Sequence, residues 1–544
     1  MRGKSVLLSS PRLSSPLLKL WLLVVAIAVG VQLGGFPLLD ADEGRNAEVA
    51  REMAATNDYV MPRLDGLPYL DKPIVYFAAE AAAMELLGPT ELAARLPAYL
   101  FTLATAALLF FFARRVWGGD APWIAAIVFL SMPLTISFAR TVIFDSALTF
   151  FVVVAWVAFY IAIEEKQRRW SVLAWASMGA AMITKGPVTF VLVLFVVIPF
   201  AWKQRALRLV FPLAGLLVFA AVIAPWVWGV SQVVPEFLNY VLVTETAQRM
   251  ATKALKRTGP PWYFLPYLLG GALPWSIVAL ASWKSLRKRE PAMLFLLLAI
   301  AVPFVFFSIS QSKRQQYILP LMAPLALVIA HIWDEARTRA AAMLLAILGV
   351  ILLVAPLVFH RTKMKPEVAA VADETAIVLG IASVVGGAIA LFAKRRDFIA
   401  VALSIPMIVL PAASIPLLRG VAERRSAKSF VAQLAPHLGP RTEVIGVEAF
   451  TGSLAFYTGR RITVVTEDAS ELTSNYLVRR YSKFTSDPSS PLKPLPHFER
   501  TLGACCPMYI LRNDDARRRA LLESRGFMRV AEGAHLVAYT QSGK

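Results

Sequence analysis

Long apolar runs separated by short polar connections occupy the chain up to about residue 418. A helix of about 20 apolar residues is long enough to cross the hydrocarbon core of a bilayer. Thirteen runs of this kind are expected to be helical: 18–39, 96–116, 121–140, 145–163, 170–184, 187–202, 209–230, 262–281, 291–308, 316–333, 340–358, 370–392 and 398–418. The pattern predicts an all-α polytopic membrane protein with about 13 transmembrane helices.

Composition agrees with this pattern. Of the 544 residues, 57% are hydrophobic and 17% are charged, whereas soluble proteins carry about 25% charged residues. A soluble enzyme and a disordered chain are both excluded, because neither tolerates so much apolar surface. The net charge of +20 indicates contact with anionic lipid at the membrane surface. No nucleic-acid motif accompanies it, so we expect no nucleic-acid partner.

Basic residues cluster in alternate connections, on the same side as the N-terminal tail. These clusters are Arg114 and Arg115; Lys166, Arg168 and Arg169; Lys203, Arg205 and Arg208; Lys284, Arg287, Lys288 and Arg289; and Lys394, Arg395 and Arg396. The positive-inside bias makes this side cytoplasmic and predicts a cytoplasmic N-terminus. An odd number of spans then carries the C-terminal segment to the outer face.

Globular character begins at Arg419. β-rich runs at 442–447, 462–465 and 508–511 alternate with helix-like stretches, and the Ser- and Pro-rich stretch 486–496 is expected to be a loop. We therefore predict two domains. Residues 1–418 form the membrane domain, with a large first outer loop at 40–95. Residues 419–544 form a small α/β domain on the outer side.

The first outer loop is unusually acidic. Asp40, Asp42 and Glu43 follow the first span closely, and amphipathic helices are expected at about 45–56 and 74–87. Asp42 either caps the following helix or takes part in chemistry with its acidic neighbours. Asp145 lies in the next short outer turn, where the alternative to a functional role is an ion pair with Arg140.

Cations also occur on the outer side, where the bias predicts few of them. Lys185 interrupts an apolar stretch and is either a snorkelling interface residue or a site residue. The turn 310–320 contains Lys313 and Arg314, and the loop 232–261 adds Arg249, Lys253, Lys256 and Arg257. Each could be a solvated charge. Together they form an environment that would bind a phosphate and stabilise its charge as it leaves.

The outer-face residues resemble a known family. The matching stretches are Ala41-Asp42-Glu43-Gly44-Arg45, Ala47-Glu48, Pro62-Arg63-Leu64, Gly66, Tyr69, Lys72-Pro73, Lys185-Gly186-Pro187, Pro274-Trp275-Ser276, Ser312-Lys313 and Tyr317-Ile318-Leu319-Pro320. They are similar to those of the aminoarabinose transferases that modify lipid A, which are related to protein O-mannosyltransferases. The resemblance implies the GT-C membrane fold, a polyprenyl-phosphate-linked sugar as donor and a bacterial inner-membrane location with a periplasmic active site.

The same resemblance implies roles for individual residues. Asp42 and Asp145, with Glu43 beside them, are expected to be the catalytic acids. The expected donor-phosphate contacts are Lys72, Arg249, Tyr317, Lys185 and Lys313, and Tyr69, Arg45 and Arg63 are expected to line the substrate cavity. The turn 312–317 departs from the Lys-Leu-Pro pattern of aminoarabinose transferases, which points to a broader sibling group.

The sequence predicts no cofactor and no metal site. Some relatives hold a metal beside this cavity with a carboxylate and histidines, but here no histidine precedes His331. A divalent metal is therefore left open but is not part of the predicted site.

The predicted function is transfer of a sugar from an undecaprenyl-phosphate-type carrier to lipid A, lipopolysaccharide or another periplasmic glycan. Two alternatives have the same demand for outer cations: a protein O-glycosyltransferase of the same fold, and a lipid-phosphate transporter or flippase. A transporter that works by alternating access would carry similar polar residues in the middle of the membrane. In this sequence the unusual charged residues cluster on the outer side instead. A lipid-binding or assembly protein without chemistry is the third alternative.

Overall fold

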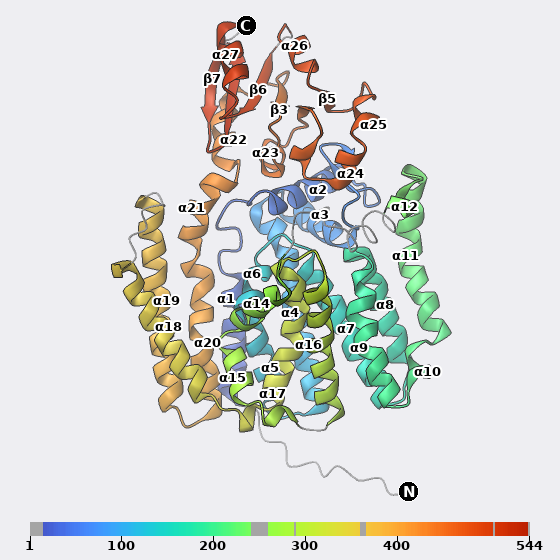
Figure 1. Cartoon of the computed structure of the whole chain (residues 1–544), viewed down its shortest axis with the longest axis vertical. Coiled ribbons are helices and arrows are strands. Elements are labelled where there is room, and N and C mark those ends of the chain that lie inside the picture. Colours follow the sequence, from blue (N-terminus) through green and yellow to red (C-terminus); the bar gives the residue numbers. More distant parts are fainter. Residues whose placement is uncertain (1–14, 241–258, 288–289, 359–365, 504–505, 542–544) are drawn as a thin grey trace, which may run out of the picture.

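The structure, a computed structural model, describes residues 15–240, 259–287, 290–358, 366–503 and 506–541. A helical bundle makes up one end of the molecule and a β-sheet the other, with α2 (Asp42–Thr56) and α3 (Val75–Leu87) between them (Figure 1). A short hairpin of β1 (Arg63–Leu64) and β2 (Leu67–Pro68) connects α2 to α3. The two amphipathic helices expected in the first loop are therefore present.

Each of the thirteen expected spans overlaps a helix or a helix pair, although the first was expected to reach residue 39 and α1 ends at Gly30. They are α1 (Pro16–Gly30), α4 (Glu91–Val116), α5 (Ala121–Leu130) with α6 (Pro133–Ala139), α7 (Asp145–Glu164), α8 (Arg168–Lys185), α9 (Val188–Lys203), α10 (Leu207–Val210) with α11 (Leu213–Val233), α14 (Phe264–Gly271) with α15 (Trp275–Ala281), α16 (Pro291–Ile309), η4 (Gln315–Leu321) with α17 (Met322–His331), α18 (Arg339–Val358), α19 (Pro366–Phe392) and α20 (Arg396–Ala413).

Not all of these helices are long and apolar enough to cross a membrane unaided. Within the described ranges seven are, or up to nine if the two bent pairs each count as one span. The α5/α6 pair bends by 66°, and the pair formed by residues 261–271 and α15 bends by 104°. Both bends precede a proline, which cannot donate the next helical hydrogen bond. The chain is thus a multi-pass membrane protein, and two of its described helix pairs are bent.

The C-terminal part contains a six-stranded mixed sheet. Its strands are β3 (Glu443–Val447), β4 (Thr463–Thr466), β5 (Leu492–Pro494), β6 (Pro507–Arg512), β7 (Phe527–Glu532) and β8 (Leu536–Gln541), in the order β5-β4-β3-β6-β8-β7. Strands β5, β4, β3 and β6 pair in parallel, whereas β8 is antiparallel to both of its neighbours, β6 and β7. Strand β5 corrects one prediction, because it lies inside the stretch 486–496 that was expected to be a loop.

Helices flank this sheet and connect it to the bundle. They are α21 (Ile415–Arg425), α22 (Lys428–Leu434), α23 (Gly452–Thr458), α24 (Asn475–Arg479), α25 (Tyr481–Thr485), α26 (His497–Thr501) and α27 (Ala516–Ser524). Helix α21 leads from the bundle towards the sheet (Figure 1).

The first loop and the C-terminal part share one hydrophobic core. Ala47, Tyr69 and Phe77 of the loop are buried in the same cluster as Leu454 and Leu477. Helices α2 and α23 approach so closely that a Cβ added to Gly452 would overlap main-chain atoms of Arg45. Glycine is required there because of this close approach. The sheet is therefore held firmly above the helices of the first loop.

Candidate active site

Asp42 is the first residue of α2 and is the most accessible carboxylate of the candidate site. Its side chain is 41% exposed and accepts hydrogen bonds from Arg45 Nη2 at 2.8 Å and from Arg314 Nη1 at 2.9 Å. The cap position of α2 is occupied by Ala41, and no side-chain cap bond forms. The alternative that Asp42 is an N-cap is therefore wrong.

The electrostatic surroundings of Asp42 keep it ionised. Partial burial raises the pKa of its carboxyl, but the charges and hydrogen bonds of Arg45 and Arg314 outweigh burial and hold the pKa below its usual value. Asp42 is thus a carboxylate at neutral pH. A carboxylate with a depressed pKa is better suited to orienting groups and balancing charge than to removing a proton.

Asp145 begins α7 and Lys185 ends α8, and the two side chains form a close ion pair. The Asp145 side chain is only 2% exposed and that of Lys185 is 14% exposed. The alternative that Asp145 pairs with Arg140 is wrong, because Arg140 Nη1 instead donates to the main-chain oxygens of Val29 and Val31, each at 2.7 Å. Lys185 is likewise not a snorkelling residue.

The turn before η4 connects these two acidic centres. Arg314 reaches Asp42, while the ring centroid of Tyr317, three residues later, lies 4.9 Å from Lys185 Nζ. Side chains from α2, from α7 with α8, and from this turn and the η4 helix that follows it therefore meet in one region. The sequence places Arg314 among the outer cations expected to bind a phosphate, but only the fold shows that it is the cation of the turn that faces Asp42.

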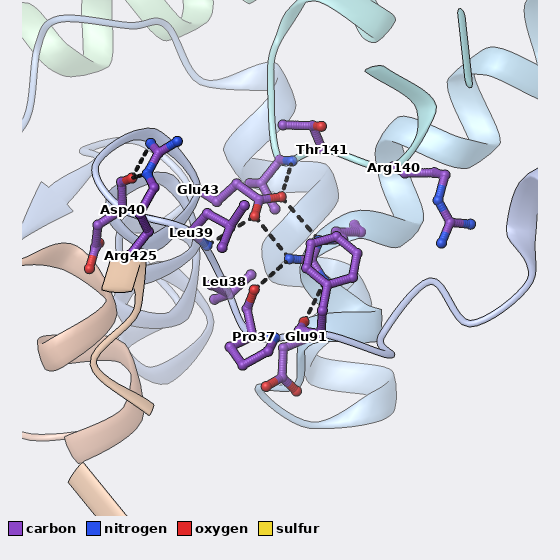
Figure 2. Close-up of polar contacts among 12 residues, drawn as sticks. Pro37, Leu38, Leu39, Asp40, Glu43, Glu91, Arg140, Thr141 and Arg425 are labelled. Carbon is purple, nitrogen blue, oxygen red and sulfur yellow. Dashed lines mark hydrogen bonds and ion pairs between the residues drawn. The ribbon is translucent and has the colours of Figure 1, made fainter. Parts of the chain in front are cut away.

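The side chains of Glu43 and Lys313 both form hydrogen bonds to other groups of the protein. Both oxygens of Glu43 accept from Arg95, at 3.0 and 2.9 Å, and the amides of Leu39 and Val142 complete the set at 3.0 Å each. Figure 2 shows these contacts converging on Glu43, with Arg140 pointing away from it. Both of its acceptor atoms are thus occupied by internal donors.

Lys313 Nζ donates to the main-chain oxygens of Phe307, Ser308 and Ser310, at 3.3, 2.7 and 2.9 Å. These carbonyls lie at the C-terminal end of α16, where a cation stabilises the unpaired acceptors. Burial lowers the pKa of Lys313. This placement departs from the expected phosphate contact.

Arg45 joins the first loop to the C-terminal part. Its guanidinium donates to Thr473 O at 3.1 Å and to Thr473 Oγ1 at 2.8 Å, and it lies 5.7 Å from the ring centroid of Tyr69. Its Nε is buried and has no hydrogen-bond partner among the described residues. A buried donor without an acceptor is costly, and here it lies beside Asp42, where an anionic ligand could accept from it.

Lys72 and Arg63, two further residues expected in the site, contact other residues of the first loop. Lys72 Nζ donates to the main-chain oxygen of Asp71 at 2.7 Å, and Arg63 lies 3.6 Å from the Asp58 carboxylate. Arg249 lies outside the described residues. In the part of the chain that the structure describes, no three His, Cys, Asp or Glu side chains converge as metal ligands.

This chain is similar to known proteins in sequence and in fold. Residues 71–228 match the family model described as dolichyl-phosphate-mannose-protein mannosyltransferase. An undecaprenyl phosphate-α-4-amino-4-deoxy-L-arabinose arabinosyl transferase from Erwinia tasmaniensis is 31% identical over 382 residues, which cover 64% of this chain and 69% of the relative. The chain belongs to this arabinosyl transferase family.

Another family member, from Serratia proteamaculans, is 31% identical over 325 residues, which cover 57% of this chain and 58% of the relative. The match to this relative thus spans less than two thirds of its length. The crystal structure of the arabinosyl transferase family member ArnT from Cupriavidus metallidurans bound to undecaprenyl phosphate superimposes with a TM-score of 0.86 at 25% identity, covering 97% of this chain and 99% of that one. The fold of the family therefore extends over nearly the whole chain.

Proposed function

We propose that this protein is a membrane glycosyltransferase that moves a sugar from an undecaprenyl-phosphate-type carrier to an acceptor at the outer face of the bacterial inner membrane. Membership of the family supports the reaction class. The carboxylates and cations that α2, α7, α8 and the turn before η4 bring together support the location of the reaction in the molecule. The observation that carries the proposal is the contact of one short segment, residues 314–317, with both centres, through Arg314 to Asp42 and through Tyr317 to Lys185.

The orientation proposed for the chain has thirteen spans, a cytoplasmic N-terminus and the C-terminal part, residues 419–544, in the periplasm. It counts each bent pair as one span and includes the shorter apolar helices and α8. In this orientation the candidate site lies at the outer membrane boundary, where a lipid-linked phosphate can reach it.

The roles of the residues follow from their surroundings. Lys185, held by Asp145 and lying over Tyr317, is the cation proposed to meet the donor phosphate, with Lys72 and Arg249 as further contacts. Arg45 offers its unpaired Nε to an anionic group, and Tyr69 supports its guanidinium. Asp42 orients the reacting groups and balances charge as the phosphate leaves. Glu43, Lys313 and Arg63 position the first loop and the turn.

The depressed pKa of Asp42 favours one class of acceptor. A hydroxyl acceptor on a protein or a glycan needs a base whose pKa lies near the working pH. A phosphate of lipid A is already ionised at neutral pH and needs no base. We therefore propose lipid A as the acceptor, with a protein O-glycosyltransferase as the alternative.

The test is to incubate the purified protein with a radiolabelled undecaprenyl-phosphate-linked aminoarabinose and with lipid A, a periplasmic glycan fraction and periplasmic protein. We expect label in lipid A. Label in protein would support the O-glycosyltransferase, and transport of the carrier lipid across a vesicle without any transfer would support a flippase instead.

A further inference from the structure

A cavity lies far from the candidate site, at the end of the bundle opposite the C-terminal sheet. It has a volume of about 1020 Å³ and lies where the ends of α9 and α10 meet the side of α16. In Figure 1 these helix ends lie at the bottom of the molecule, whereas the sheet lies at the top. The cavity therefore opens near the opposite membrane boundary.

The rim of this cavity is strongly basic. Lys166, Lys203, Arg205 and Arg208 line it, and none of its other described lining residues is acidic. Lys203, Arg205 and Arg208 are exposed and form no salt bridge with any residue that the structure describes, whereas Lys166 interacts electrostatically with Glu164. Three cations from one short segment repel one another unless an anion lies between them. The rim thus fits a phosphate group.

The walls of the same cavity are apolar. Leu294 and Leu298, one turn apart on α16, form one wall, and Pro199 and Trp202 of α9 form another. The Trp202 side chain is 73% exposed, and an exposed tryptophan is typical of the level at which lipid headgroups lie. A small soluble anion would gain nothing from these walls, whereas a lipid places its acyl chains against them.

We propose that this cavity binds an anionic glycerophospholipid, with its headgroup phosphate between Lys203, Arg205 and Arg208 and its acyl chains along α9 and α16. Basic pockets between membrane helices bind lipid headgroups in this way. The site is separate from the candidate active site, and the proposal does not depend on the enzymatic reaction.

The test uses the full-length protein in a mild detergent with added lipid. Binding of phosphatidylglycerol and of phosphatidylcholine is measured by native mass spectrometry, and the shift in Tm that each lipid produces is measured in parallel. We expect the wild type to retain phosphatidylglycerol and to be stabilised by it more than by phosphatidylcholine. The variant Lys203→Gln/Arg205→Gln/Arg208→Gln should bind phosphatidylglycerol at least about tenfold more weakly, which corresponds to about 1.4 kcal/mol.

The matched control removes three exposed charges that do not line the cavity, in the variant Lys284→Gln/Arg287→Gln/Lys394→Gln. It should keep the affinity and the Tm shift of the wild type. Equal loss in both variants, or equal binding of the two lipids to the wild type, would overturn the proposal. A Tm shift with soluble glycerol phosphate as large as that with phosphatidylglycerol would show that the acyl chains contribute nothing, and would also overturn it.

Discussion

Arg314 and Asp42 form an ion pair at 2.9 Å although 272 positions separate them in the sequence. Arg314 lies in the turn before η4 and Asp42 begins α2, so the pair connects the helical bundle to the first loop. Three residues later, within η4, the Tyr317 ring lies beside Lys185, the partner of Asp145. Movement of this turn would therefore change the surroundings of both acidic residues at once.

Arg314→Gln should change the pH dependence of the reaction. Arg314 helps to hold the pKa of Asp42 below its usual value, so its removal raises that pKa. A carboxylate with a higher pKa becomes protonated at a higher pH, and the acidic limb of the kcat/KM profile should move upward in pH. Arg63→Gln, whose guanidinium faces Asp58, should leave that limb in place. An unchanged limb in the Arg314 variant would remove Arg314 from the control of Asp42.

The Asp145–Lys185 pair should show strong coupling in a double-mutant cycle. Removing one partner leaves a buried charge without compensation, which typically costs about 3 to 5 kcal/mol. Lys185→Met and Asp145→Asn should each lower the free energy of unfolding in detergent, and the double variant should recover part of the loss. Additive losses would mean that the two side chains do not interact.

Gly452→Ala should separate the first loop from the C-terminal part. A Cβ at this position would overlap the main chain of Arg45, and such overpacking costs about 1 to 3 kcal/mol. Thermal unfolding and limited proteolysis of the C-terminal part should both detect the change. Gly503→Ala is the control, because no atom lies within 4 Å of a Cβ added there. Equal stability of the two variants would contradict the close approach of α2 and α23.

Asp65 should make the stability of the outer part depend on pH. Burial, with Glu52 and Glu48 nearby, raises the pKa of Asp65 well above its usual value. Above about pH 4 the unfolded chain has released this proton while the folded protein keeps it. The stabilisation is therefore complete below the unfolded pKa and is lost as the pH rises towards the folded one.

Asp65→Asn keeps the acceptor for Ile462 N, at 2.8 Å in the wild type, and removes the titration. The fall in Tm between pH 5 and pH 9 should become shallower in this variant. Glu467→Gln, at an exposed position, should retain the slope of the wild type. A slope unchanged by Asp65→Asn would show that Asp65 does not titrate in this range.

The helices of the bundle could be predicted from the sequence because a membrane-spanning helix is recognised from the apolar residues of its own segment. A long run of apolar residues predicts a spanning helix from its own segment, although among the described residues only seven to nine helices are long and apolar enough to cross a membrane unaided. Strand β5 was not predicted because its residues Leu492–Pro494 lie among serines and prolines. Its pairing with β4 stabilises an extended conformation that its own sequence does not favour. The shared core of Tyr69 and Leu477 was invisible for a related reason, since burial between distant segments leaves no local pattern.

The site was predictable as a set of residue types and not as a set of pairs. Lys185 stood out because a cation on the outer side contradicts the positive-inside bias, and Asp42 and Asp145 stood out because they are acidic residues close to the ends of apolar spans. Glu43 and Lys313 stood out equally, although the fold assigns them to Arg95 and to the end of α16. Which cation meets which acid depends on contacts across hundreds of positions, so Arg314 could be predicted as an outer cation but not as the partner of Asp42.

The most direct measurement of the central claim is the rate of sugar transfer to lipid A by Asp42→Asn, with binding of undecaprenyl phosphate measured on the same preparation. Asn keeps the size of the side chain but loses the charge that Arg45 and Arg314 surround. We expect transfer to fall at least about 100-fold while the variant stays folded and still binds the carrier. Transfer at the wild-type rate would contradict the assignment of Asp42 to the reaction.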